Sequence, residues 1–373
     1  MKRLLPPDRL LIGSVTALML FGIIMVASAS LSISEARYGN PYRIIGHWVL
    51  YIPLGFALMW WASRIDISWW KAVSVPLLAL AFLIMVLVLI PGLGKNINGA
   101  RRWFSLPLFT LEPVEFAKPI VILYMAYYMA AFPERLRQFA TGLAPMLTVL
   151  AIMVVLLLMQ PDFGNAVLLT AVCIAMWFAG GVPIRHLVSL IVTAVPIGLI
   201  TMVAEPYRLR RLLSFIDPWN DPYGSGYQLV QSMIAFGAGG VDGAGLGQGV
   251  QKLFYLPESF TDFISAVIGE ELGLVGTLSL IVLFSILMWR CIRLAIDVND
   301  MFARLLVLGC SLLLGLAFTI NMGASMGLLP TKGMPLPFVS YGGSALFGEC
   351  LLIGMVLAVQ RHLPQNHRPG MPA

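Results

Sequence analysis

Charged residues are scarce in this chain. Lys, Arg, Asp and Glu together make up 11% of its 373 residues, whereas hydrophobic residues make up 59%. Soluble domains usually carry about 25% charged residues. This deficit, together with a mean hydropathy of +0.87, excludes an ordinary soluble globular protein and indicates a membrane protein.

Cysteine is rare as well. The chain has four, which lie in or beside apolar runs and form no CxxC pair: Cys173, Cys291, Cys310 and Cys350. Disulfide frameworks and structural zinc sites need paired or clustered cysteines. We therefore expect neither role for these residues, and we interpret them as small buried hydrophobic side chains.

Long uncharged runs take the place of the missing charge. They recur at Leu10–Ser34, Ala72–Gly94, Gln138–Pro161 and Leu305–Thr331. Crossing a bilayer core of about 30 Å takes about 20 helical residues, and each run is long enough. The first run exceeds the apolar core of a signal peptide, about 7–15 residues, so we interpret it as a retained membrane span.

This pattern predicts an all-α, polytopic integral membrane protein with about ten transmembrane helices, in a single domain over residues 1–373. The expected spans are residues 10–32, 44–63, 72–91, 114–131, 141–160, 164–181, 185–204, 264–289, 303–326 and 341–360. One connection is much longer than the others. Residues 205–263 should form a large extracytoplasmic loop between the seventh and eighth helices.

Lys and Arg are unevenly distributed between the two predicted sides. Thirteen lie on the side of the N-terminus, and seven lie in the short loops opposite: Arg37, Arg43, Lys95, Arg101, Arg102, Lys118 and Lys332. Cytoplasmic loops carry an excess of Lys and Arg, and long loops are left out of such a count. We therefore expect both termini in the cytoplasm and the long loop outside.

The outer cations are few but clustered, in Asn98–Phe104 (NGARRWF) and Pro206–Leu213 (PYRLRRLL). Clustered cations at a membrane surface attract anionic headgroups without any specific function. They also suit a phosphate-bearing ligand, because Arg pairs with phosphate in bidentate geometry. Charge alone leaves both interpretations open.

Acidic residues interrupt the apolar segment Leu256–Gly273 (LPESFTDFISAVIGEELG). Ser259 and Asp262 have the spacing of a helix capping box, which alone would explain Asp262. Glu270 falls on the same helical face about 12 Å further along, where capping cannot explain it. An ionisable group at membrane depth needs a cavity or a partner, so we expect this face to line a polar, water-accessible groove with Asp262 at its mouth. Glu271, on another face, should pair with a neighbouring helix.

Three other segments also bear on function. Two of them have two interpretations each, and one is rich in Pro and Gly. Glu115 and Lys118 can pair with each other at their three-residue spacing, or Lys118 can face an acid of the eighth span or a substrate phosphate. The Pro- and Gly-rich stretch Gly327–Ser344 predicts a structured loop or re-entrant turn that carries Lys332. The glycines of Gly237–Gly249 suit either turns or a backbone cradle for phosphate.

Taken together, these segments resemble the SEDS family of cell-wall polymerases. The similarity lies in NGARRWF, PVEFAK, QPDFG, and the stretches Ala204–Gly240, Gly245–Gly273 and Gly327–Ser344, which follow the family's order. Within the family, PYRLRR, PWNDPYGSGYQL and LLPTKGMPLP are more similar to the cell-division branch than to the elongation branch.

The resemblance implies an enzyme that polymerises lipid II into glycan strands at the outer face of the bacterial cytoplasmic membrane. It implies that Asp262 is the general base for the acceptor 4-hydroxyl, with Glu115, Glu270 and Ser340 in supporting roles. One position departs from the family motif, because Phe260 stands where the family usually has His. A proton-transfer or metal-binding role of that His cannot apply here.

The leaving group of this reaction is a lipid pyrophosphate, whose growing negative charge cations would stabilise. The candidates are Arg101, Arg102, Lys118, Arg208, Arg210, Arg211 and Lys332. A divalent cation, Mg²⁺ or Mn²⁺, could share this task, and no organic cofactor is expected. Ser265 also replaces a common Phe of the family.

The resemblance also implies partners and a place in the cell. The partners are lipid II (an undecaprenyl-pyrophosphate-linked disaccharide peptide), a class B penicillin-binding protein transpeptidase and other membrane proteins of the division machinery, with no nucleic acid. The protein would be a multi-pass protein of the cytoplasmic membrane at the division septum.

A lipid II flippase or another transporter is the alternative, since intramembrane acids in a polar cavity would suit it equally. Transporters concentrate charge near the bilayer midplane, often in repeated halves. Here the charges gather at the outer interface and in one outer loop, and no internal repeat is evident. This distribution favours the enzyme. The chemically specific outer loop likewise argues against a protein that serves only as a scaffold.

Overall fold

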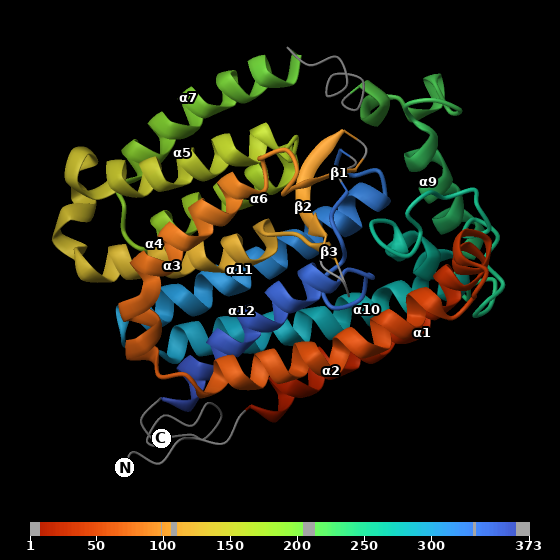
Figure 1. Ribbon diagram of the computed structural model, residues 1–373, viewed down its shortest axis with the longest axis horizontal. Helices are drawn as coiled ribbons and strands as arrows, with labels where there is room; N and C mark the ends of the chain where they lie inside the picture. Colours follow the sequence, from red (N-terminus) through yellow and green to blue (C-terminus); the bar gives the residue numbers. More distant parts are fainter. Residues whose placement is uncertain (1–7, 98, 106–109, 204–212, 331–332, 363–373) are drawn as a thin grey trace.

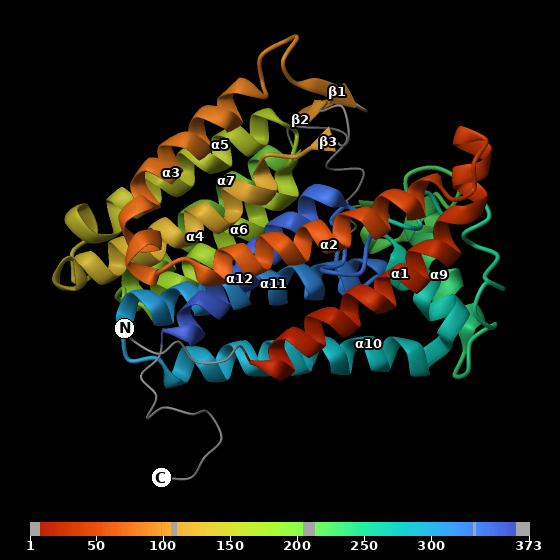
Figure 2. The ribbon, with the colours of Figure 1, turned by 60° about the horizontal axis from the view of Figure 1, so that its bottom comes forward.

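The computed structural model describes residues 8–97, 99–105, 110–203, 213–330 and 333–362. The arginines Arg208, Arg210 and Arg211 and the lysine Lys332, predicted as substrate-binding residues, lie outside these ranges. Within them, the chain forms a bundle of long helices that run in roughly the same direction or its opposite (Figures 1 and 2). The predicted helical membrane fold is confirmed.

Ten helices coincide with the ten predicted segments. They are α1 (Arg9–Tyr38), α2 (Arg43–Arg64), α3 (Ile67–Leu87), α4 (Val114–Ala131), α5 (Ala144–Met159), α6 (Phe163–Ala179), α7 (Ile184–Val203), α10 (Ile264–Asp297), α11 (Met301–Ser325) and α12 (Gly343–Arg361). Within the described ranges, 8 helices have the length and apolarity of a membrane span, whereas α6 and the stretch Ile184–Pro196 of α7 are shorter apolar helices. The number of membrane crossings therefore stays a prediction.

Aspartate side chains cap the N-termini of several of these helices. Asp8, Asp66, Asp162 and Asp300 each occupy the N-cap position of a helix and accept hydrogen bonds from its first backbone N–H groups. Such a cap satisfies donors that have no partner inside the helix. The bundle thus places part of its small number of carboxylates where long apolar helices begin.

Smaller elements lie in the connections, among them the short helical turns Pro133–Arg137, Phe139–Leu143 and Pro218–Asn220. A short antiparallel sheet of β1 (Lys95–Ile97), β2 (Ala100–Ser105) and β3 (Thr110–Leu111) lies between α3 and α4, and it adds to the helical fold an element that was not predicted. Gly99, with φ of 82°, follows β1 and allows the chain to reverse into β2. Helix α9 (Tyr227–Gly239) lies in the predicted long loop.

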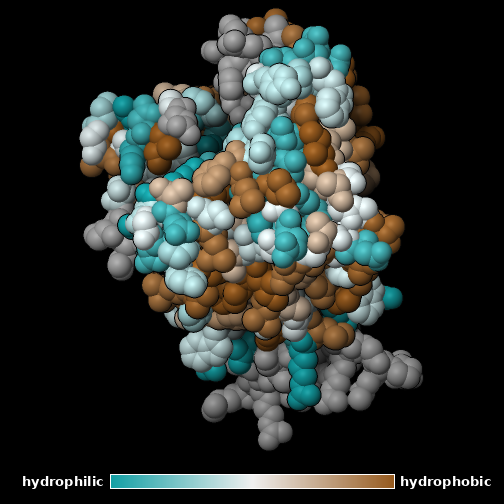
Figure 3. All heavy atoms as spheres, turned by 90° about the vertical axis from the view of Figure 1, so that its right-hand side faces the viewer, coloured by the Kyte–Doolittle hydropathy of each residue, from teal (hydrophilic) through white to brown (hydrophobic). Residues whose placement is uncertain are grey.

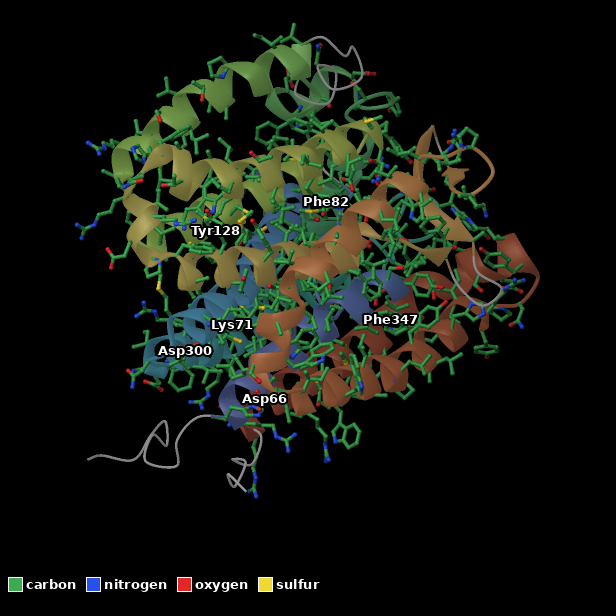
Figure 4. The ribbon with its side chains drawn as sticks, turned by 60° about the vertical axis from the view of Figure 1, so that its left-hand side comes forward. Asp66, Lys71, Phe82, Tyr128, Asp300 and Phe347 are labelled. Carbon is green, nitrogen blue, oxygen red and sulfur yellow. The ribbon has the colours of Figure 1, made fainter. Side chains whose placement is uncertain are left out.

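The segments predicted to face the cytoplasm meet at one end of the bundle. The backbone N–H of Asp8 donates to Gln360 at 2.9 Å, and Asp8 also pairs with Arg290. In Figure 4, Asp66 and Asp300 lie at the same end, whereas Phe347 of α12 lies farther along the bundle. Helix α9 and the first turns of α10 lie at the opposite end (Figure 1). The grouping agrees with the predicted topology, and which end faces the cytoplasm stays a prediction.

Helix α10 is interrupted at Gly273, which has φ of 63° and ψ of −156°. The glycine-rich loop, Gly237–Gly249, packs into this break. The N–H of Ala244 donates to the carbonyl of Glu270 at 2.9 Å, and the N–H of Leu274 donates to the carbonyl of Gly240 at 3.0 Å. The loop approaches so closely that a Cβ at Gly243 would lie 2.2 Å from the carbonyl oxygen of Glu271. Close packing therefore explains three glycines of this segment, Gly239, Gly243 and Gly249.

Candidate active site

Asp262 lies in the turn that precedes α10, and its side chain is partly buried. The predicted capping box was wrong. Helix α10 begins at Ile264, four residues after Phe260, where a helix capped by Ser259 would begin, and no side chain caps it. The turn is tight instead, because the N–H groups of Thr261 and Phe263 both donate to the carbonyl of Glu258, whose φ is 55°. Asp262 therefore needs an explanation other than helix capping.

Three consecutive backbone carbonyls of this turn are held by later parts of the chain. Phe260 accepts from the N–H of Tyr341 at 3.0 Å, Thr261 accepts from Oγ of Ser340, and Asp262 accepts from Nδ2 of Asn321 at 2.8 Å. Buried carbonyls that are paired in this way cannot move independently of their donors. The turn that carries Asp262 is thus fixed to α11 and to the segment before α12.

The segment of residues 333–342 forms the wall beside the Asp262 carboxylate. A Cβ placed on Gly333 would lie 2.6 Å from Oδ2 of Asp262, so the carboxylate rests against the Gly333 backbone. Oγ of Ser340 accepts from the N–H of Leu336 at 2.8 Å, which folds the segment back on itself. Met334, Leu336, Phe338 and Val339 are buried. The predicted structured loop is confirmed for its described part.

Glu349, inside α12, supports the same segment. Its Oε2 accepts from the N–H of Phe338 at 2.8 Å, and Phe338 has φ of 64°, a conformation that costs energy for a residue with a side chain. Sequence reasoning had no account of Glu349 beyond a hydrogen bond between helices. The structure assigns it to the wall segment that contacts Asp262.

Phe260 is a packing residue. Its side chain is 5% exposed and stands edge-on to the ring of Tyr341, with 5.8 Å between centroids. Tyr341 in turn contacts Trp48 and Tyr51 of α2. The phenyl ring that replaces the family's usual His thus joins the turn to an aromatic cluster, and it offers no group for proton transfer.

Glu270 does not line a groove, and the predicted water-accessible face of α10 was wrong. Glu270 is buried, and its carboxylate accepts from the N–H groups of Val250 at 2.7 Å and Gln251 at 3.2 Å. On the same face, a Cβ at Gly269 would lie 2.3 Å from the Phe236 ring of α9. This face is covered by α9 and the glycine-rich loop, and Glu270 anchors that loop.

Glu271 joins the same loop to α1. Its carboxylate pairs with Nζ of Lys252 at 2.5 Å and accepts hydrogen bonds from Ser28 of α1 and from the N–H of Gly247 at 2.9 Å. The contact with Ser28 agrees with the expected partner on a neighbouring helix. Lys252 was not singled out from the sequence, because a single Lys in a long polar loop ordinarily remains in water.

A second polar cluster lies at the start of α4. Nζ of Lys118 is 2.7 Å from Oε1 of Glu115 and 3.2 Å from Oδ1 of Asn165 in α6. Asn165 in turn donates to Asp162 at 2.7 Å. Of the two interpretations of Lys118, the pair with Glu115 is the one observed. Lys118 and Glu115 are both buried, so the pair is desolvated.

The two arginines of β2 also contact protein groups. Arg102 lies 3.8 Å from Glu112 and 3.7 Å from Asp162, and its guanidinium covers the ring of Trp103. Arg101 donates to the carbonyl of Leu89 at 3.2 Å. Both arginines are partly exposed, although the Nε atom of each is buried.

Glu112 lies between β3 and α4, and its surroundings alter its pKa. Burial, followed by the negative charge of nearby Glu115, raises the pKa of Glu112 to about 8, although the Arg102 guanidinium acts in the opposite direction. Its backbone N–H is held by Oγ of Ser344 at 2.9 Å. The sheet, α4 and the start of α12 are thereby joined at the end of the bundle that also carries Asp262.

Metal ligands are sparse in this region. The part of the chain that the structure describes contains no group of three or more His, Cys, Asp or Glu side chains that could hold an ion. The four cysteines are free and buried, in agreement with their interpretation as apolar side chains.

Asn321 is the most informative residue that sequence reasoning missed. It lies in the uncharged run Leu305–Thr331, is 1% exposed, and bonds Asp262 through its carboxamide. A carboxamide at membrane depth is costly unless it has partners, and that cost was the available signal. Gly333 gave no comparable signal, because the sequence does not reveal what a glycine packs against.

The surface near the site is mixed in polarity. Figure 3 faces the end of the molecule that carries α9 and the first turns of α10, and it shows hydrophilic side chains gathered over part of this end, beside a broad hydrophobic area. A ligand with both a polar head and an apolar tail could contact both kinds of surface here.

Comparison with known proteins gives the chain relatives over nearly its whole length. Residues 8–365 match the family of FtsW, RodA and SpoVE, described as "Cell cycle protein". The chain is 45% identical over 347 residues to the probable peptidoglycan glycosyltransferase FtsW of Coxiella burnetii, which covers 92% of this chain and 93% of that protein. It is 44% identical over 357 residues to the protein of the same name from Thioalkalivibrio sulfidiphilus, covering 95% and 89%.

Solved structures share the fold. A chain from work described as "Structural coordination of polymerization and crosslinking by a peptidoglycan synthase complex" has a TM-score of 0.79 and 29% identity, and the match covers 96% of this chain and 98% of that chain. The rod shape determining protein RodA of Thermus thermophilus has a TM-score of 0.72 and 26% identity, with 96% and 99% covered.

Proposed function

Because the chain belongs to the family of FtsW, RodA and SpoVE, we propose that it is a peptidoglycan glycosyltransferase that polymerises lipid II, with Asp262 as the general base. The curated relatives carry the name of this activity. The observation that carries the proposal is the anchoring of Asp262, whose turn is bonded to α11 and to residues 333–342 through three backbone carbonyls.

The reaction needs one base and a stabilised leaving group. The Asp262 carboxylate takes the proton of the acceptor 4-hydroxyl as the hydroxyl oxygen attacks the anomeric carbon of the donor. The bond from that carbon to the phosphate oxygen breaks, and the electron pair leaves with the lipid pyrophosphate. A single displacement of this kind inverts the anomeric configuration. Glycosidases use a second carboxyl group to protonate the leaving oxygen, and a pyrophosphate needs no such acid.

Cations at the same end of the bundle suit the departing pyrophosphate. Arg101 and Arg102 are partly exposed, and each keeps guanidinium N–H groups beyond its protein contacts. Arginine forks match phosphate oxygens, so we assign Arg101 and Arg102 to the pyrophosphate. Lys118 is buried against Glu115, and we assign it to holding α4 and α6 in register around the site.

A divalent cation fits this site only as a companion of the substrate. The described residues offer no three-ligand cluster, while a pyrophosphate brings its own oxygen ligands. A bound Mg²⁺ or Mn²⁺ would neutralise the leaving group. Asp262 would bind and orient the acceptor hydroxyl and hold its proton.

The cellular setting follows from the same relatives. We propose that the protein acts in the cytoplasmic membrane at the division septum, with its termini in the cytoplasm, the loop of residues 205–263 outside, and a class B penicillin-binding protein as its partner. The similarity to a chain of a synthase complex that couples polymerisation and crosslinking supports the partner.

The proposal is tested with the purified protein, its partner transpeptidase and lipid II. Wild type should make glycan chains, and Asp262→Asn should make none, because the amide keeps the shape but cannot take the proton. Asp242→Asn is the matched control, since Asp242 is an exposed carboxylate of the same loop, and it should polymerise like wild type.

The alternative outcomes are informative. Undiminished polymerisation by a folded Asp262→Asn variant would refute Asp262 as the base. If wild type makes no polymer but carries lipid II across vesicle bilayers, the protein is a transporter, and the glycosyltransferase proposal is wrong.

A further inference from the structure

Asn321 is a buried polar residue in the otherwise apolar second half of α11. Its side chain is 1% exposed. A primary amide in such surroundings costs free energy unless its donors and acceptor are all used. The contacts of Asn321 therefore indicate which parts of the molecule it is there to join.

The orientation of the carboxamide is fixed by its partners. Nδ2 lies 2.8 Å from the carbonyl oxygen of Asp262 and 2.6 Å from that of Met334. Carbonyl oxygens only accept, so both N–H bonds of the amide must point at them. Oδ1 accepts from Oγ of Ser265 at 3.2 Å, and this hydroxyl is also 2.8 Å from Oγ of Ser325.

These three bonds join the two walls of the candidate site. Asp262 carries the carboxylate, and Met334 follows directly on Gly333, whose backbone the carboxylate touches. One amide group thus sets the distance between the turn and the segment of residues 333–342. We infer that Asn321 is a positioning residue for Asp262, an inference that rests on the proposed function of this site.

The effect on the reaction follows from the geometry of proton transfer. A base must approach the hydroxyl to about 2.6–3.2 Å, and a misplacement of about 1 Å can cost about 10²-fold in rate. Asn321 acts on the Asp262 backbone and does not contact the reacting atoms in this arrangement. Its loss should lower kcat for polymerisation while leaving the binding of lipid II nearly unchanged.

Ser265 gives this chain its own support for the amide. The family that this chain resembles commonly has Phe at this position, and a Phe side chain could not donate to Oδ1. Here the hydroxyl of Ser265 fills that role, and Ser265 is itself buried. The chain thus has a second, milder variant with which the same idea can be tested.

The main experiment compares Asn321→Asp with wild type in the lipid II polymerisation assay. The carboxylate keeps the shape but directs lone pairs at two carbonyl oxygens, so kcat should fall about 10–100-fold, with KM within about threefold. Ser232→Ala is the matched control. It removes a buried hydroxyl that donates to the carbonyl of Ser325 at 2.6 Å, and its kcat should stay within about twofold of wild type.

Hydrogen exchange supplies a readout that does not depend on activity. In Asn321→Asp, amides of residues 256–263 and 333–342 should exchange at least about tenfold faster than in wild type, whereas Ser232→Ala should leave both segments unchanged. If wild type proves to lack polymerase activity, the proposed function fails, and exchange alone decides whether Asn321 positions the turn.

Several results would overturn the inference. They are wild-type kcat in Asn321→Asp, an equal loss of kcat in Ser232→Ala, or unchanged exchange in both segments of Asn321→Asp. If Asn321→Asp does not fold, Ser265→Ala decides. It frees one side of the amide and should lower kcat about 3–10-fold at constant KM, and an unchanged kcat in that variant would refute the positioning role.

Discussion

Breaking the ion pair of Lys252 with Glu271 should destabilise the end of the molecule that carries α9 (Figure 1). The two side chains are 8% and 0% exposed, and Nζ lies 2.5 Å from Oε1. Replacing Lys252 by Met leaves a buried carboxylate without its cation, which typically costs about 3–5 kcal/mol. Ser28 and the N–H of Gly247 still bond Glu271, so we expect the lower value, about 3 kcal/mol.

Thermal unfolding of the detergent-solubilised protein measures this effect. A loss of about 3 kcal/mol corresponds to a decrease in Tm of about 4 °C for a chain of 373 residues. Arg293→Met is the control, because Arg293 is an exposed cation on α10, and its loss should change Tm by less than about 1 °C.

A double-mutant cycle separates the ion pair from packing. Lys252→Met combined with Glu271→Gln removes both charges, so the double variant should be more stable than the sum of the two single losses by about 1–3 kcal/mol. Strictly additive losses, or a Lys252→Met variant as stable as Arg293→Met, would refute the reasoning that an uncompensated buried charge drives the effect.

Two other variants test the surroundings of the site. Gly333→Ala should lower polymerisation at least about tenfold, because the new Cβ would lie 2.6 Å from Oδ2 of Asp262. Gly342→Ala is the control and should keep wild-type activity, because its Cβ would meet nothing closer than 3.5 Å. Equal activities of the two variants would contradict the close contact. Glu112 has its pKa raised to about 8, so its proton stabilises the fold fully below the pKa of an unfolded Glu, about 4.3, and this stabilisation is lost as pH rises through about 8. Tm should therefore fall as pH rises from about 5 to about 8 in wild type and level off above that, and it should fall less steeply in Glu112→Gln; parallel curves would exclude Glu112 as the cause.

The helices could be predicted from the sequence because lipid imposes length and apolarity on each one. The ten predicted ranges lie close to ten observed helices for this reason. The sheet between α3 and α4 escaped prediction, since strands of a few residues leave little periodicity to detect. The break at Gly273 also escaped, because a glycine inside an apolar run does not reveal that another backbone fills the gap.

The sequence indicated which residues lie near the candidate site more reliably than it indicated what those residues contact. Asp262 and Ser340 do lie together, and the pair of Glu115 with Lys118 was one of two predicted alternatives. The interpretation of Glu270 failed because helical geometry gives the face of a residue but not what covers that face. Glu270 points at the backbone of residues 250 and 251, a contact between parts of the chain about 20 residues apart. Loop packing of this kind leaves no periodic trace in a sequence.

The anchoring of Asp262 has a consequence for the order in which the chain is made. Asn321, Ser340 and Tyr341, which bond the carbonyls of its turn, are all translated after it, and Glu349 of α12 in turn holds the segment that contains two of them. A nascent chain that has inserted α10 already contains the acid, but not these three anchors. The geometry that catalysis requires is therefore completed only when the last helix enters the membrane, and an unfinished chain left in the bilayer would remain inactive.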